Sequence, residues 1–250
     1  MPFVFCVCAA YAAEWRNRMY NIAGINVDMT PKYPRTLRQS EAYLTDADSK
    51  AEIRIRLSDE FLEQRQKENP HLTLEDCEYI WLGSEFYELM PEFGGLLLHS
   101  SAVVYGGEGF LFSAPCGTGK STHTQLWLKR FEGAYILNDD KPAIKYTKDG
   151  FYVYGTPFSG KTDLNVNEGV PLRGVCILER GEKNSIRRAE PEEALFGILN
   201  QTVRPVSEER MDKLLKILDK LVTDVPVYRL YCNMDIEAAE VAYKGMTENK

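Results

Sequence analysis

Two strings in this 250-residue chain combine glycines with a lysine and a hydroxyl residue, a combination that can bind phosphate. The first reads APCGTGKS over residues 114–121, and the second reads GTPFSGKT over residues 155–162. In a loop of the G-x-x-x-x-G-K-[ST] type, backbone N–H groups surround the phosphates, the lysine contacts them and the hydroxyl ligates Mg²⁺. Only the second string fits this pattern literally, because Ala114 replaces the first glycine of the other.

The flanking sequence nevertheless favours the first string. The pattern binds phosphate between a strand and a helix, whose positive N-terminal end faces the anion. Residues 109–114 (GFLFSA) predict a strand, and residues 121–131 (STHTQLWLKRF) predict a helix without Gly or Pro. The second string is followed by TDLNVNEGVP, which disfavours a helix. We therefore expect nucleotide phosphates to bind at the first string, with these residues: Ala114, Pro115, Cys116, Gly117, Thr118, Gly119, Lys120, Ser121 and Thr122.

Two adjacent aspartates follow in the next apolar run. The segment AYILNDD places Asp139 and Asp140 at the end of a predicted strand. One carboxylate there can hold Mg²⁺ together with Ser121, and the other can accept a proton from an attacking hydroxyl. The order of these two roles stays open, with Asp139 taken as the ligand beside Ser121. His99 lies in an apolar stretch before the loop strand and is by default a core residue.

The elements around these residues predict an α/β arrangement, because strands and helices alternate from residue 96 onward. Residues 96–105 (LLLHSSAVVY) predict a strand that forms a hairpin with residues 109–114. Further strands are expected at 151–154, 174–180 and 225–232, and helices at 191–203, 207–225 and 236–245. In the helix over 207–225, one apolar stripe holds Met211, Leu214, Leu215, Leu218, Leu221, Val222 and Val225.

The first 95 residues predict a smaller α+β region. A strand is expected over 19–29, a half-buried strand over 51–58 and a polar helix over 59–69. Thr73 caps a longer helix, with Asp76 completing a form of the capping box. Its apolar face would hold Cys77, Ile80, Trp81, Phe86, Tyr87 and Met90.

Composition excludes several classes of protein. The net charge of −7, without a Lys/Arg-rich segment, disfavours nucleic-acid binding. Six irregularly spaced cysteines favour a reducing cytoplasm, and no metal role is expected for Cys6 or Cys8. The apolar run over residues 2–13 is shorter than the roughly 20 residues of a membrane span. It also lacks the basic start of a signal peptide, so residues 1–18 are interpreted as an extension before Met19.

The segments LHSSAVVY, SAPCGTGKST, ILNDD and PLRGVCIL, in this order, resemble the HPr kinase/phosphorylase family, whose nucleotide core is similar to that of phosphoenolpyruvate carboxykinase. The resemblance implies a phosphate-loop kinase domain over residues 96–250, after the region 1–95, and a capacity to form homo-oligomers. It implies that Lys120 binds the β- and γ-phosphates of ATP and that Ser121 and one aspartate ligate Mg²⁺. The other aspartate would activate a serine hydroxyl with electrostatic help from His99, and Arg173 would help to organise the site.

These features predict an ATP- and Mg²⁺-dependent kinase that phosphorylates a hydroxyl, first of all a serine of a peptide or protein. A small-molecule kinase and a non-catalytic nucleotide-binding regulatory module remain alternatives. The family has acidic residues where this chain has Pro115 and Thr122, which favours the last alternative. The second string is expected to line the acceptor pocket, where Ser159 and Lys161 would contact either a phosphate or an acceptor group.

Overall fold

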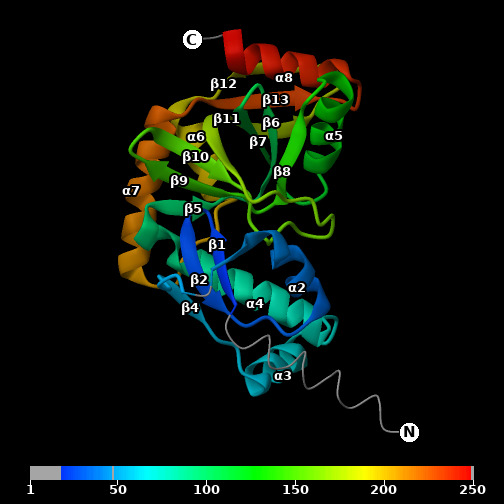
Figure 1. The fold of residues 1–250 in the computed structure, drawn as a ribbon. Coiled ribbons are helices and arrows are strands. Elements are labelled where there is room, and N and C mark those ends of the chain that lie inside the picture. Colours follow the sequence, from blue (N-terminus) through cyan, green and yellow to red (C-terminus); the bar gives the residue numbers. More distant parts are fainter. Residues whose placement is uncertain (1–17, 47, 249–250) are drawn as a thin grey trace, which may run out of the picture. The chain divides into compact units, whose positions relative to one another are not determined.

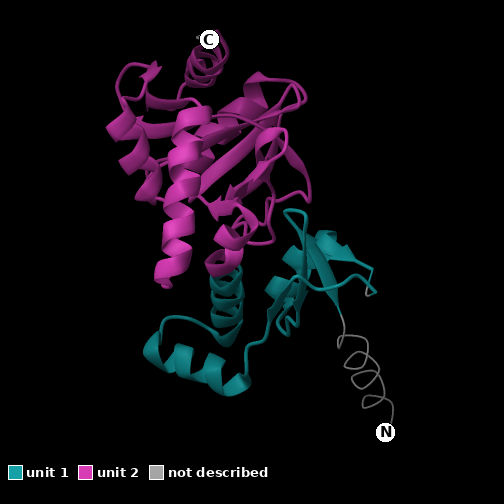
Figure 2. Cartoon of the chain, turned by 90° about the vertical axis from the view of Figure 1, so that its left-hand side faces the viewer, with its two compact units in different colours: residues 1–86 teal, residues 87–250 magenta. Residues whose placement is uncertain are grey.

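A computed structural model describes residues 18–46 and 48–248 and divides the chain after Phe86 into two compact units (Figure 2). The division falls within helix α4 (Leu74–Leu89). The apolar run over residues 2–13, with Cys6 and Cys8, lies outside the described residues, as do residues 1–17 of the expected extension. The two units are described separately below.

Unit 1 contains a four-stranded sheet in the order β3-β1-β2-β4. The single strand expected over 19–29 is wrong, because β1 (Met19–Ile22) and β2 (Ile25–Met29) form an antiparallel hairpin. Ala23 and Gly24 turn the chain between them with φ of 53° and 72°. The remaining elements are α2 (Pro34–Ser40), the 3₁₀ helix η1 (Glu41–Tyr43), β3 (Leu44–Thr45), β4 (Ile53–Ile55) and α3 (Asp59–Glu68).

The capping box at the start of α4 is confirmed. The Asp76 N–H donates to Thr73 Oγ1 and the Thr73 N–H donates to the Asp76 carboxylate, both at 3.1 Å. The expected apolar face is wrong at Ile80, which is 41% exposed. Glu78 is buried instead, because its carboxylate accepts the backbone N–H groups of Lys32 and Tyr33 at 2.6 and 3.0 Å.

Unit 2 is built on a nine-stranded sheet within the described residues. Its main path runs β5-β9-β10-β11-β7-β6-β8, and β13 pairs with both β11 and β12. The strands are β5 (Gly95–Leu97), β6 (Ser100–Tyr105), β7 (Glu108–Ser113), β8 (Tyr135–Asp140), β9 (Ala143–Thr147), β10 (Gly150–Tyr154), β11 (Gly169–Arg180), β12 (Ser185–Arg188) and β13 (Val227–Cys232). The helices are η2 (Met90–Phe93), α5 (Lys120–Arg130), α6 (Pro191–Leu199), α7 (Glu208–Asp224) and α8 (Glu237–Glu248).

Helices cover both faces of this sheet, as expected of an α/β protein (Figure 1). Along β7, Leu111 packs into a core with α6 and α7, whereas Phe110 and Phe112 pack into a second core with α5 and α8. The apolar stripe of α7 is confirmed at Leu214, Leu218 and Leu221, which are fully buried, but it is wrong at Leu215, which is 44% exposed. None of the helices in the described part of the chain is long and apolar enough to cross a membrane.

One short pairing, between residues 97–99 and 201–203, breaks an expected strand and shortens an expected helix. Leu98 and Thr202 form an antiparallel bridge, the His99 N–H donates to Gln201 O at 2.8 Å and the Val203 N–H donates to Leu97 O at 3.1 Å. The run 96–105 is therefore broken into β5 and β6, and α6 ends at Leu199 rather than at residue 203. The expectation of one strand and of the longer helix is wrong for this single reason.

The two leucines of α7 provide a matched test of the core. Leu218→Ala removes a fully buried side chain and is expected to lower the free energy of unfolding by about 2–5 kcal/mol. Leu215→Ala on the same helix is expected to change it by less than about 0.5 kcal/mol. Urea unfolding followed by circular dichroism measures both, and equal losses would contradict the packing described here.

Candidate functional site

The predicted phosphate loop, both aspartates and His99 meet at one edge of the unit 2 sheet. Strands β7, β11 and β13 are parallel, and β8 runs in the same direction because both β7 and β8 pair antiparallel with β6. Residues 114–119 follow β7, and Asp139 and Asp140 end β8. The carboxyl ends of parallel strands are where open α/β sheets bind ligands. The topology thus places the loop and the aspartates where a ligand site is expected.

The register of β6 adds His99 to this edge. Ser100, the first residue of β6, stands opposite Ser113 of β7 and opposite Asp140 of β8. His99 directly precedes Ser100, and its carbonyl accepts the Ser113 hydroxyl at 2.9 Å. The default interpretation of His99 as a core residue is therefore wrong.

The loop between β7 and α5 has the backbone that a phosphate-binding loop requires. Gly117 and Gly119 have φ of 76° and 123°, in the region that favours glycine, although a Cβ at either position would meet no neighbouring atom. Ala114 is not among the described residues with positive φ, so alanine fits there. Helix α5 begins after Gly119 without a side-chain cap, which leaves the N–H groups of its first turn available to an anion.

Lys120 lies at this helix start with its side chain folded onto the loop. Its ammonium donates to Ala114 O at 2.8 Å and to Pro115 O at 3.3 Å. Burial lowers the pKa of Lys120, and the nearby carboxylates of Asp140 and Asp139 act in the opposite direction. An anionic ligand at the loop would favour the charged lysine further.

Ser121 and Asp139 form the second pair of the site. The Ser121 hydroxyl donates to Asp139 Oδ1 at 2.9 Å, and the aspartate is buried. These are two oxygen donors of the kind that Mg²⁺ prefers. No group of three or more His, Cys, Asp or Glu residues that could hold a metal occurs in the described part of the chain. The pair therefore fits a cation that arrives with a phosphate ligand and keeps several waters.

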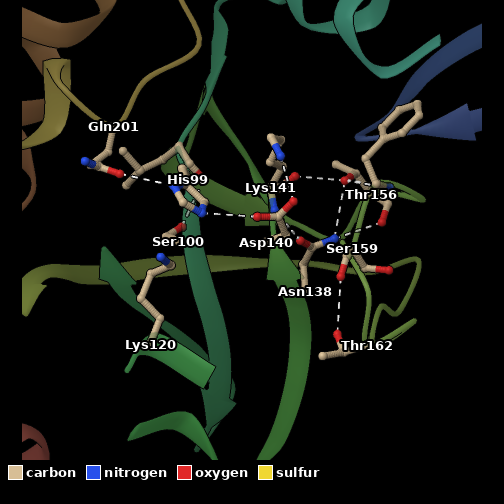
Figure 3. Close-up of polar contacts among 12 residues, drawn as sticks. His99, Ser100, Lys120, Asn138, Asp140, Lys141, Thr156, Ser159, Thr162 and Gln201 are labelled. Carbon is tan, nitrogen blue, oxygen red and sulfur yellow. Dashed lines mark hydrogen bonds and ion pairs between the residues drawn. The ribbon is translucent and has the colours of Figure 1, made fainter. Parts of the chain in front are cut away.

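Asp140 is held by His99 and Lys141 (Figure 3). Its Oδ1 lies 3.3 Å from His99 Nε2, and its Oδ2 accepts the Lys141 ammonium at 2.6 Å. On the other side of the ring, His99 Nδ1 lies 3.1 Å from Gln201 Oε1. Burial would raise the pKa of Asp140, but His99 and Lys141 outweigh it and hold this pKa below its usual value. Asp140 is thus ionised at neutral pH and fixed in position.

Lys141 and Gln201 are site residues that sequence reasoning missed. Lys141 follows the two aspartates directly, so the charge next to Asp140 was visible in the sequence. Gln201 reaches His99 through the bridge between residues 97–99 and 201–203, a contact across about 100 positions that no local pattern indicates.

The second string, residues 155–162, lines one cavity together with the first string but is not followed by a helix. This cavity has a volume of about 460 Å³ and is lined by His99, Cys116, Gly117, Gly119, Lys120, Ser121, Thr122, Asp139, Asp140, Gly160, Lys161 and Thr162. A Cβ at Gly155 would lie 1.9 Å from Val166 O, so packing alone requires the first glycine of this string. The sequence preference for residues 114–121 is supported by this difference in context.

The two expected acceptor residues have different places. Ser159 is fully buried, and its hydroxyl accepts the Asn165 side-chain amide at 2.9 Å. The expectation that Ser159 contacts an acceptor is therefore wrong, because its side chain belongs to the interior of the loop. Lys161 lines the cavity, and its contact with a phosphate or an acceptor group stays a prediction.

Arg173 does not join the site. It lies at a register shift of β11, at the level of the first residues of β7, and donates to the carbonyls of Met246 and Thr247 at 3.1 Å. Its expected role beside the loop is wrong, since it anchors the end of α8 at the opposite end of the strand. Arg180, at the loop end of β11, donates instead to Gly117 O and Thr118 O at 2.6 and 3.2 Å.

A second cavity, of about 510 Å³, shares Gly117, Gly119 and Thr122 with the first. Its other lining residues are Thr118, His123, Leu178, Arg180, Gly181, Cys232, Asn233 and Met234. Burial lowers the pKa of His123 to about 4, so this ring is neutral at pH 7. The loop therefore borders one charged cavity and one that is largely uncharged apart from Arg180.

Two comparisons with known proteins gave no match for this chain. No protein-family model matches it. No curated protein matches it either. Its function must therefore be argued from the geometry of this edge.

Cys116 allows the loop to be tested chemically. It is exposed and lines the first cavity, whereas Cys77, Cys176 and Cys232 are buried. We predict that alkylation of Cys116 blocks nucleotide binding, because the adduct would fill the space of the phosphates. At MgATP concentrations ten times its Kd, alkylation should slow about tenfold.

The measurement is the rate of Cys116 modification by mass spectrometry in a chain with Cys6→Ser and Cys8→Ser. Cys116→Ser serves as the control and should bind nucleotide in the presence of the reagent. Unchanged nucleotide binding after complete modification would show that the phosphates do not lie at this loop.

Proposed function

We propose that unit 2 is an ATP- and Mg²⁺-dependent kinase that transfers the γ-phosphoryl group to a hydroxyl, first of all a serine of a peptide or protein. One observation carries this proposal. The uncapped start of α5 carries a buried lysine and Ser121, which donates to Asp139, and all of these groups line one cavity with Asp140. Packing alone gives no reason for these groups to meet.

The phosphates would bind where the loop offers positive charge. The first-turn N–H groups of α5 would donate to phosphate oxygens, and the Lys120 ammonium would exchange the carbonyls of Ala114 and Pro115 for phosphate oxygens. Ser121 and Asp139 would hold Mg²⁺, whose positive charge would stabilise the negative charge of the β- and γ-phosphates. Arg180 would keep the carbonyls of Gly117 and Thr118 turned away from the phosphates.

Asp140 would act as the base. Its carboxylate is ionised and oriented by His99 and Lys141, so it can accept the proton of an acceptor hydroxyl. The hydroxyl oxygen would bond to the γ-phosphorus as the bond to the β–γ bridging oxygen breaks, and ADP would leave. Gln201 would fix the ring of His99 behind this base.

The nucleoside half of ATP would occupy the second cavity. It begins at the loop residues shared with the first cavity, and Leu178 and Met234 offer apolar surface for a base. This arrangement and the resemblance of residues 97–188 to the HPr kinase/phosphorylase family support a phosphate-loop kinase core in residues 96–250. In this proposal the protein acts in the cytoplasm on a nucleotide and an acceptor, with nucleic acid not a partner.

A non-catalytic nucleotide-binding module is the second candidate. Lys141 occupies one oxygen of the aspartate that would act as base, and Pro115 and Thr122 replace residues that are acidic in the family. Such a module would bind MgATP at the same loop without phosphorylating an acceptor.

The test uses γ-labelled ATP with a serine-peptide library and a panel of hydroxy acids. Wild type is expected to transfer label, Lys120→Met to lose at least about 100-fold through loss of phosphate stabilisation, and Asp140→Asn to lose about 100- to 10,000-fold while still binding MgATP. Lys148→Met, in the exposed turn after β9, is the matched lysine control and should behave as wild type.

Equal transfer by wild type and both site variants would contradict the residue roles. MgATP binding without transfer to any acceptor would favour the non-catalytic module. Absence of MgATP binding in the wild type would refute both functions.

A further inference from the structure

The loop that follows β10 is held against β8 at both of its ends. The Asn138 side-chain amide donates to Thr156 O at 2.8 Å. At the other end, the Asp139 N–H donates to Leu164 O and the Val166 N–H donates to Leu137 O, both at 3.0 Å. The loop over residues 155–166 is therefore hydrogen-bonded at both of its ends to β8, the strand that carries the two aspartates.

The middle of the loop has a fixed conformation beside Asp140 (Figure 3). Ser159 is buried and accepts from Asn165 through its hydroxyl, and its carbonyl accepts the Thr162 hydroxyl at 3.2 Å. Gly160 has a φ of 72°, and a Cβ there would lie 3.0 Å from the Asp140 Cβ. The backbone of Gly160 thus lies against the proposed base, and Lys161 is the next residue.

The basic side chains in and next to the first cavity differ in what they contact. Lys120 is held by the loop carbonyls that phosphates would replace, and Lys141 and His99 both contact Asp140. Lys161 forms no hydrogen bond or ion pair with any residue in the described part of the chain, although it lines the cavity. The two carboxylates of the cavity are already engaged, Asp139 by Ser121 and Asp140 by its cations.

Lys161 is exposed at the cavity, so its ammonium is free to meet an anionic group of a ligand beside the proposed base. The nucleotide phosphates already have Lys120 and the α5 N-terminus at the other wall. We propose, building on the kinase function above, that the acceptor carries a carboxylate or phosphate group beside its hydroxyl and that Lys161 binds this group. The ion pair positions the hydroxyl toward Asp140.

The experiment measures probe binding to the full chain saturated with Mg²⁺ and the non-hydrolysable analogue AMP-PNP, by calorimetry. The small probes are glycerate and glycerol 3-phosphate, with neutral glycerol as their control. The peptide probes are acetyl-Gly-Ser-Glu-amide and its Gln counterpart. The variants are Lys161→Met, Lys161→Arg and the exposed control Lys148→Met.

We expect an anionic probe to bind wild type about 10- to 100-fold more tightly than its neutral counterpart, the range of one charge-assisted contact. Lys161→Met should remove this preference, Lys161→Arg should keep part of it, and Lys148→Met should keep all of it. AMP-PNP affinity should stay within about twofold in every variant, since Lys161 is assigned to the acceptor. A preference limited to the small probes identifies a free hydroxy acid or phosphate, and one limited to the peptides identifies an acidic serine peptide.

Equal binding of anionic and neutral probes by wild type, with AMP-PNP bound, would overturn this inference and leave the kinase proposal standing. A loss of AMP-PNP affinity of about tenfold or more in Lys161→Met would also overturn it, because the lysine would then belong to the nucleotide. Failure of wild type to bind AMP-PNP would refute the kinase proposal itself and, with it, this inference.

Discussion

Strand β6 pairs with β7 on one side and β8 on the other, and this pairing sets the relative positions of the phosphate loop, the two aspartates and His99. Ser100 stands opposite Ser113 and Asp140, so the start of the loop, the end of the aspartate strand and His99 meet at one level of the sheet. Slipping β6 by one residue would turn its buried side chains to the opposite faces. Both cores of unit 2 depend on that alternation, which fixes the register and with it the site.

The charges at this edge explain how an acidic chain could handle a polyanion. The net charge is −7, yet one cavity gathers Lys120, Lys161 and His99, with Lys141 next to it, around two aspartates. Asp139 accepts a hydrogen bond from Ser121, and Asp140 contacts Lys141 and His99. In the proposed function, Lys120 at the start of α5 and Lys161 on the 155–166 loop would attract the anionic groups of the two ligands.

Local patterns predicted most of this edge. The strand–loop–helix context chose residues 114–121 over the literal match, and the apolar run before Asp139 predicted β8. What the sequence could not show depends on contacts between distant segments. The bridge between residues 97–99 and 201–203 broke an apolar run, shortened α6 and brought Gln201 to His99.

The arginine expected at the site illustrates the same limit. Arg173 and Arg180 both lie in β11, and only the register of that strand against β7 shows which of them reaches the loop. Likewise, the helical spacing of apolar residues alone predicted that Ile80 and Leu215 lie on buried faces, although both are exposed. Apolar residues at helical spacing predict that one face of the helix is buried, but the width of the buried face depends on the elements that pack against it.

The central claim is that a nucleotide binds with its phosphates on residues 114–121. Hydrogen–deuterium exchange of the full chain with and without Mg²⁺ and AMP-PNP tests it most directly, because the N–H groups concerned begin a helix without a side-chain cap. The account predicts slower exchange in peptides that cover residues 115–122 when the nucleotide is bound. Unchanged exchange there, with protection confined to residues 155–166, would contradict it.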